Sequence, residues 1–186
     1  FPFSTRYLVE AGNSATWAVH YLHHFDRRVM GPRPSSGGIF RACMEFATMG
    51  WAIGAAVGTA LGNPGTPVVC ITGDGSLLMS GQELTVAVSE KLPITFVVLN
   101  DGVLGMVKHG QRLAGAEPIG YQLPPVDFCA LAKAMGADAY EIRSPADLMA
   151  LDINAMCSRD GPTLLDVHVD PEEVPPMKTR MKVLGV

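Results

Sequence analysis

Two stretches of the chain decide its fold: 68–76, which reads VVCITGDGS, and 94–102, which reads ITFVVLNDG. Each is a continuous apolar run, rich in β-branched residues, that ends abruptly in glycine and polar residues. Such a run is typical of a strand buried on both faces of a parallel sheet, because a strand with one wet face alternates instead. Both polar ends therefore belong to the same edge of the predicted sheet.

Strand and helix patterns alternate on either side of these two stretches. Strands are predicted at 6–10, 68–72, 94–99, 139–142 and 163–169, and helices at 14–25, 49–61, 82–90, 127–135 and 145–157. This order predicts an α/β fold, with an open, mainly parallel sheet and helices on both faces. We find no internal repeat and no linker, so residues 1–170 are expected to form one domain. Residues 171–186, interrupted by proline and glycine, are expected to form a C-terminal arm.

The composition argues against several classes of protein. The chain has 186 residues, 48% hydrophobic and 17% charged, and a formal net charge of −4, so a nucleic-acid partner is not expected. Its longest apolar run, 51–61, is about half of the roughly 20 residues that a membrane span needs. The four cysteines form no C-x-x-C pair, which favours free thiols and a cytoplasmic location. The chain opens with FPFSTR, so we expect it to be a piece of a longer protein.

Polar side chains stand at the ends of the two buried stretches. Asp74 follows the first and Asn100 the second, 26 positions later, which is about the length of a crossover helix and a returning strand. Ligands bind at this edge of an open parallel sheet, and hard oxygen ligands suit magnesium or calcium. Either motif alone could be an ordinary glycine turn. The pair predicts a metal site for a phosphorylated ligand; a dinucleotide fingerprint is not met, because Leu78 occupies the place of its third glycine.

Gly73-Asp74-Gly75, followed by 24 residues and Asn100, resembles the signature of thiamin diphosphate enzymes. Over roughly residues 6–176 the chain is similar to the C-terminal diphosphate-binding domain of the acetolactate synthase, pyruvate decarboxylase and benzoylformate decarboxylase group. The resemblance implies that Asp74, Asn100 and the carbonyl of Gly102 bind Mg²⁺, which holds the cofactor thiamin diphosphate. It also implies that Gly73, Gly75 and Ser76 bind the diphosphate.

The resemblance implies further walls of the same cofactor site. The segment Glu10–Ser14 matches the first diphosphate loop, in which Gly12, Asn13 and Ser14 would bind the cofactor, although it also reads as a plain helix N-cap. Met49 matches the bulky residue that wedges the cofactor into its V shape, a catalytic role, and the backbone of Ala47 and Met49 would hydrogen-bond the pyrimidine. The alternative for Met49 is one more core methionine.

The segment after the metal loop is where the chain departs from the acetolactate synthases. Met106 matches a residue that faces the substrate pocket, but Gly110 stands where those enzymes carry a tryptophan. The pocket wall is therefore expected to differ, and the substrate stays open. His109 or Arg112 could bind a carboxylate or phosphate, or belong to a solvated loop. The group of His20, His23 and His24 is predicted to be a solvated face rather than a metal site.

The implied function is that of a 2-keto acid decarboxylase or carboligase, a lyase or transferase, in a homo-oligomer without nucleic-acid or membrane partners. In this family the catalytic glutamate belongs to a pyrimidine-binding domain, in the same longer chain or in a separate subunit, and no glutamate here matches it. Two other functions stay open: a non-catalytic cofactor-binding module, and an unrelated magnesium-nucleotide-binding α/β domain.

Overall fold

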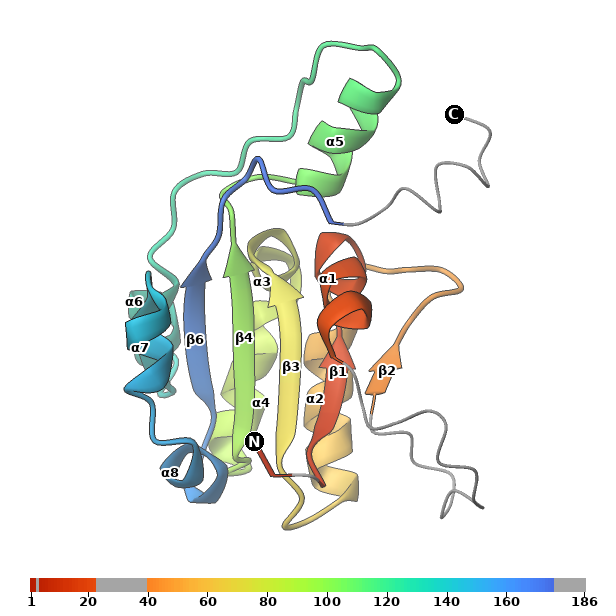
Figure 1. The fold of residues 1–186 in the computed structure, drawn as a ribbon. Coiled ribbons are helices and arrows are strands. Elements are labelled where there is room, and N and C mark those ends of the chain that lie inside the picture. The colour runs from red at the N-terminus through yellow and green to blue at the C-terminus, as the bar shows by residue number, and fades with distance from the viewer. Residues whose placement is uncertain (3, 23–39, 176–186) are drawn as a thin grey trace.

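The computed structural model describes residues 1–2, 4–22 and 40–175 (Figure 1). The strands of this part of the chain form one sheet in the order β2-β1-β3-β4-β6-β5, and every neighbouring pair is parallel. They are β1 (Arg6–Val9), β2 (Phe40–Ala42), β3 (Val68–Gly73), β4 (Ile94–Asn100), β5 (Asp138–Ile142) and β6 (Thr163–His168). The predicted open parallel sheet is confirmed.

Helices lie on both faces of the sheet (Figure 1). They are α1 (Asn13–Tyr21), α2 (Trp51–Gly62), α3 (Asp74–Ser80), α4 (Leu84–Ser89), α5 (Gly105–Leu113), α6 (Phe128–Ala134), α7 (Pro145–Met149) and α8 (Ile153–Ser158), with a 3₁₀ turn η1 (Gly81–Glu83) between α3 and α4. Residues of α2, α4 and α6 bury one face of the sheet around the fully buried Phe96 of β4. Helices α1 and α8 cover parts of the other face.

The strand order creates a switch point between β1 and β3. From β1 the chain moves outward to β2, and then crosses back over α2 to β3 on the other side of β1. The connections that leave β1 and β3 therefore diverge, and a crevice opens at the carboxyl ends of these strands. The polar residues singled out from the sequence follow these strands and β4.

Several boundaries differ from those predicted. The helix expected at 145–157 is two helices, because the carboxylate of Asp152 accepts the N–H of Ala155 at 2.9 Å and begins α8. The helical region expected at 82–90 begins earlier, at Asp74. Strand β2 and helix α5 were not predicted. The predicted end of the helix at 14–25 lies outside the described residues.

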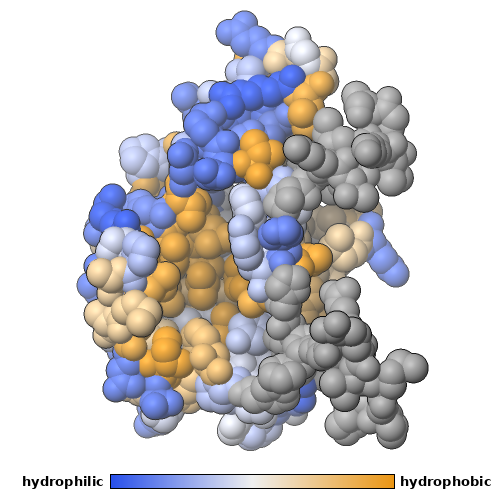
Figure 2. All heavy atoms as spheres, viewed as in Figure 1, coloured by the Kyte–Doolittle hydropathy of each residue, from blue (hydrophilic) through white to orange (hydrophobic). Residues whose placement is uncertain are grey.

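Within the described residues, the sheet face that carries α1 and α8 is only partly covered. Helix α1 packs around Val9, whereas α8 packs through Met156 against β5 and β6, and the two apolar clusters are separate. Figure 2 shows apolar side chains at the surface between α1 and α7, over β4 and β6. Among the described residues, no helix is both long enough and apolar enough to cross a membrane.

The segment after β6 runs beneath α5 (Figure 1). There the Glu172 carboxylate pairs with the side chains of Lys108 and Arg112. Lys108 is buried, and its ammonium also donates to the carbonyl of Pro171 at 3.2 Å. Residues 176–186 lie outside the described residues, so the C-terminal arm stays a prediction.

Candidate functional site

A pocket of about 750 Å³ lies at the switch point, beyond the carboxyl ends of β1, β3 and β4. Its walls come from segments that follow four different strands, together with the turn that precedes α2. The lining residues that belong to these segments are Ala11–Ser14, Ala47, Met49, Gly73–Ser76, Asp101, Val103–Val107, Val169, Asp170 and Glu173. The chain thus brings segments that are far apart in sequence to one concave surface, as expected for a ligand site.

All the residues predicted to bind the organic cofactor line this pocket. They are Gly12, Asn13, Ser14, Ala47, Met49, Gly73, Gly75, Ser76 and Met106, and Asp74 lines it with them. Asn100 and Gly102 instead line an adjoining pocket of about 370 Å³, which Asp74 and Asp101 also reach. The two pockets therefore meet at Asp74 and Asp101.

The surroundings of Asp74 disfavour the ionised form of its carboxyl group. It is buried, and its carboxylate oxygens accept hydrogen bonds from the N–H groups of Gly75 at 2.7 Å and Gly102 at 2.8 Å. Burial, reinforced by the nearby carboxylate of Asp101, raises the pKa of Asp74 to about 6. Burial also raises the pKa of Asp101, whose carboxylate accepts the N–H of Val103 at 3.1 Å. Two mutually repelling carboxylates at one wall are a donor set for a hard divalent cation, which would relieve the repulsion.

Asn100 is turned away from this pair of carboxylates. Its amide donates to Oδ1 of Asp166 on β6 at 2.8 Å. The direction follows from strand alternation, because Asn100 lies on the same side of β4 as Phe96 and Val98, two residues of the core packed by α2, α4 and α6. The carbonyl of Gly102 is also used, since it accepts the N–H of Leu123 at 3.0 Å.

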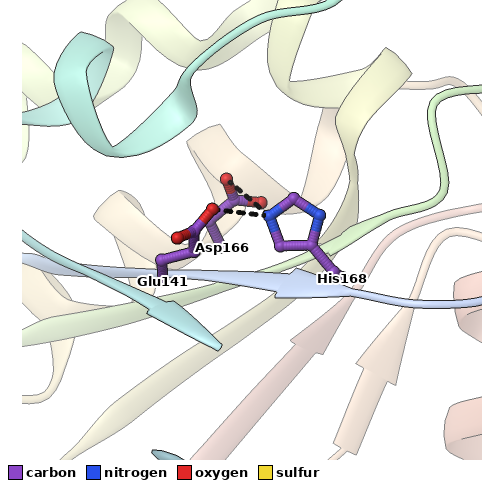
Figure 3. Close-up of side chains that lie close together, drawn as sticks. All are labelled: Glu141, Asp166 and His168. Atoms are coloured by element: carbon purple, nitrogen blue, oxygen red, sulfur yellow. Dashed lines mark hydrogen bonds and ion pairs between the residues drawn. The ribbon is translucent and has the colours of Figure 1, made fainter. Parts of the chain in front are cut away.

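The Asp166 that holds Asn100 belongs to a small ionic cluster on β5 and β6 (Figure 3). Nε2 of His168 lies 3.1 Å from Oε1 of Glu141 and 3.7 Å from Oδ2 of Asp166. The three ligand atoms lie within 4.8 Å of one another, but the guanidinium of Arg143 already pairs with Glu141 at 2.6 Å. We therefore infer that the cluster has a structural role and holds the ends of β4, β5 and β6 together.

Met49 approaches the glycine that follows Asp74. A Cβ atom on Gly75 would lie 3.3 Å from Cε of Met49 and 2.9 Å from Cδ2 of Leu104, so a larger residue would displace both side chains. The turn that presents Met49 is strained at Ala47, which has a φ of 53°, whereas Gly50 adopts its φ of 90° without strain. Left-handed backbone at a residue with a side chain is uncommon and costs free energy.

The loop after β1 contributes an unsatisfied polar group. Oδ1 of Asn13 is buried and has no hydrogen-bond partner among the described residues, and Asn13 lines the large pocket. Gly12, with a φ of 89°, turns the chain into α1, and Ser14 is buried beside it. An unpartnered buried amide in a pocket wall fits a ligand that supplies the missing hydrogen bond.

Arg112, His20 and His109 do not line the large pocket. Arg112 pairs with Glu172, and His109 is buried on α5 with no partner for its Nε2 in the described part of the chain. Burial lowers the pKa of His109. His20 is exposed on α1, whereas His23 and His24 lie outside the described residues.

The sequence interpretation did not name Asp101, and it placed Glu10 in the diphosphate loop without giving it a role of its own. The signal for Asp101 was available, because the alternation that continues from Phe96 and Val98 turns Asn100 toward the core. Glu10 is fully buried next to the loop after β1. An isolated acid at a strand end gives no sequence signal for that burial.

Comparisons with known proteins agree on one group. The profile of the family described as "Thiamine pyrophosphate enzyme, C-terminal TPP binding domain" matches residues 10–167. The chain is 33% identical over 190 residues to an acetolactate synthase large subunit of Parasynechococcus marenigrum, covering 95% of this chain and 28% of that protein. It is 32% identical over 182 residues to the large subunit of acetolactate synthase isozyme 2 of Escherichia coli, covering 94% and 31%.

A solved structure shares the fold. A Mycobacterium smegmatis protein described as thiamin diphosphate-dependent superimposes with a TM-score of 0.69 at 29% identity, over 91% of this chain and 30% of that one. The chain spans about a quarter to a third of the length of the relatives it matches.

Proposed function

Because the chain belongs to the thiamine pyrophosphate enzymes, as their C-terminal cofactor-binding domain, we propose that its 750 Å³ pocket holds the diphosphate of that cofactor through a divalent metal. Thiamine pyrophosphate, also called thiamin diphosphate, with a divalent metal such as Mg²⁺ is the cofactor of this family. The observation that carries the proposal is the buried carboxylate of Asp74 beside the half-buried carboxylate of Asp101, at the wall of that pocket.

Asp74 and Asp101 are the metal-binding side chains in this proposal. Asp101 takes the place predicted for Asn100, whose amide is engaged with Asp166. Val103 takes the place predicted for Gly102 as the backbone ligand, because it lines the large pocket and Gly102 does not. Magnesium keeps few protein ligands and completes its shell with phosphate oxygens and water, which suits two carboxylates and one carbonyl.

The remaining walls bind and orient the organic part. We assign Gly12–Ser14 and Gly73–Ser76 to the diphosphate, because N–H groups of a glycine-containing backbone can approach its oxygens closely. Met49, supported by the turn at Ala47, limits the conformations of the bound cofactor, and Met106 lies at the side where a substrate would enter. The cofactor supplies the covalent chemistry at 2-keto acids, and these residues supply position and exclude water.

The activity that we propose for the whole protein is decarboxylation or carboligation of a 2-keto acid, as in its acetolactate synthase relatives. A second domain would supply the glutamate that faces the pyrimidine, either in the same longer chain or from another subunit, within a homo-oligomer. The apolar surface over β4 and β6, which the described residues leave uncovered, supports such a neighbour, since large apolar patches commonly mark interfaces (Figure 2). A cytoplasmic location is part of the proposal, supported by four free cysteines.

Calorimetry with thiamin diphosphate and Mg²⁺ tests the proposal on the intact gene product that carries this chain. Asp74→Ala and Asp101→Ala should each weaken binding at least about tenfold, because each removes a charged metal ligand. Asn100→Ala should weaken it much less, and Asp160→Ala, at an exposed position, serves as the matched control. Equal losses for Asn100→Ala and Asp101→Ala would contradict the assignment of Asp101, and absence of binding by the wild type would overturn the function.

Turnover of pyruvate by the same preparation separates an enzyme from a non-catalytic module. Binding without turnover of pyruvate or of longer 2-keto acids would favour the module. Glu173→Gln tests where the missing base lies, because Glu173 is the glutamate that lines the pocket among the described residues. Activity should survive this change if a second domain supplies the base.

A further inference from the structure

Glu10 is a buried acid whose side chain has no part in the proposed metal or diphosphate contacts. It follows β1 directly, is 0% exposed, and fixes its own backbone by donating its N–H to the carbonyl of Ile71 at 2.8 Å. No lysine, arginine or histidine of the described residues forms an ion pair with its carboxylate. A buried carboxylate without a cation is costly to maintain, so its persistence calls for hydrogen bonds to the charged form.

Backbone amides supply those hydrogen bonds. Oε1 of Glu10 accepts the N–H of Ala11 at 3.1 Å, and Oε2 accepts the N–H of Ala52 at 3.3 Å. The amides of Gly50 and Trp51 also interact favourably with the carboxylate, although burial dominates and raises the pKa of Glu10. Gly50–Ala52 is the start of the twelve-residue helix α2, whose N-terminal N–H groups favour an anion.

The two groups of amides belong to different walls of the large pocket. Ala11 opens the loop that continues through Gly12 to Ser14, whereas Gly50 follows Met49 directly. The bond from Ala52 to Glu10 spans 42 positions of the sequence. One side chain therefore ties the proposed diphosphate loop to the turn that carries Met49, although Glu10 itself does not line the pocket.

The turn around Met49 needs such a tie. Ala47 and Gly50 both have left-handed backbone, and the hydrogen bond inside the turn, from the Trp51 N–H to the Thr48 carbonyl, is long at 3.4 Å. A strained turn persists only where surrounding structure over-determines it. The buried carboxylate of Glu10 interacts with backbone amides at the end of this turn and at the start of α2.

We propose that Glu10 is a positioning residue. Its carboxylate fixes the distance between the Met49 turn and the 11–14 loop, so that the pocket fits a ligand that contacts both. This inference rests on the proposed function. A ligand that occupies only the metal and the diphosphate loop depends on Glu10 much less than thiamin diphosphate does, because it makes no contact with Met49.

The test compares two ligands on the intact gene product that carries this chain. Dissociation constants for thiamin diphosphate and for inorganic pyrophosphate, each with Mg²⁺, are measured by calorimetry for the wild type and for Glu10→Gln. Glutamine has the same shape but presents an N–H₂ group to one of the amides, so affinity for thiamin diphosphate should fall by about tenfold and that for pyrophosphate by less than about twofold. Glu90→Gln, at the exposed end of α4, should change neither.

Equal changes for the two ligands, or no change for either, would overturn the role of Glu10 while leaving the proposed function intact. A wild type that binds neither ligand would overturn the proposed function first. Should Glu10→Gln unfold, Glu10→Asp decides in its place. It keeps the buried charge but is one methylene shorter and cannot reach the amides of both Ala11 and Ala52, so it too should weaken thiamin diphosphate selectively.

Discussion

The substitution Asp74→Asn measures how much the buried carboxylate destabilises the protein while no cation is bound to it. Burial and the neighbouring Asp101 raise the pKa of Asp74 from 3.8 to about 6. Asp74 is 3% exposed, so water and salt screen this effect little. The shift of about two pKa units, at about 1.36 kcal/mol each, corresponds to about 3 kcal/mol of folding free energy.

The sign follows from which state holds the proton more tightly. A folded pKa above the unfolded value means that the native state of the metal-free protein binds the proton of Asp74 more strongly than the unfolded state does. The contribution of Asp74 to stability therefore declines as pH rises from about 3.8 to about 6, and above that the full penalty of about 3 kcal/mol applies. Asparagine does not titrate, so the variant lacks this decline.

Urea unfolding of metal-free wild type and Asp74→Asn between pH 4 and pH 8 measures the difference directly. The free energy of unfolding of the variant minus that of the wild type should rise by about 3 kcal/mol across this range. At every pH this difference is lower by about 1–2 kcal/mol than the loss of the charge alone would give, because asparagine keeps only one of the hydrogen bonds from Gly75 and Gly102. Asp160→Asn, at an exposed position, serves as the matched control. A flat or falling difference for Asp74→Asn would refute the reasoning.

Two further substitutions test the pocket wall at Gly75 and the contact of Glu172 with α5. Gly75→Ala should weaken binding of thiamin diphosphate with Mg²⁺ by at least about tenfold, because the new Cβ would meet Met49 and Leu104. Gly58→Ala on α2 should instead raise the free energy of unfolding by about 0.5–1 kcal/mol, because nothing lies within 4 Å of its new Cβ. Glu172→Gln should lower the melting temperature, because hydrogen bonds from Arg112 and Lys108 lower the pKa of Glu172 to about 2. The wild-type advantage should be complete above pH 4.5 and fade as pH falls toward 2, and a constant advantage would contradict that role.

The sheet and the place of Asp74 at its carboxyl edge could be predicted from the sequence, because their signals are local. The runs at 68–72 and 94–99 are apolar throughout, and each is followed by glycine and a polar side chain, so one short stretch indicates both the strand and the polar residue at its end. All the residues predicted for the organic cofactor line one pocket for the same reason, since each follows a strand or precedes a helix at that edge.

Other features depend on contacts that no short window contains. Helix α5 forms although Gly110 lies inside it, and Glu172, sixty positions after Arg112, binds that helix. The choice between Asn100 and Asp101 depends on whether β4 ends at residue 99 or 100. Since side chains alternate along a strand, a shift of one residue decides which side chain faces the core.

The carboxyl edge of the sheet concentrates groups that cost stability, while the tightly packed core surrounds Phe96 in the middle of β4. Asp74 costs about 3 kcal/mol when ionised, and a left-handed alanine such as Ala47 costs of order 1 kcal/mol. A ligand at one hundred times its dissociation constant stabilises a protein by about 2.7 kcal/mol. Binding of metal and cofactor is therefore of the right size to offset these costs, and the pocket end should be the part of the domain that opens first in their absence.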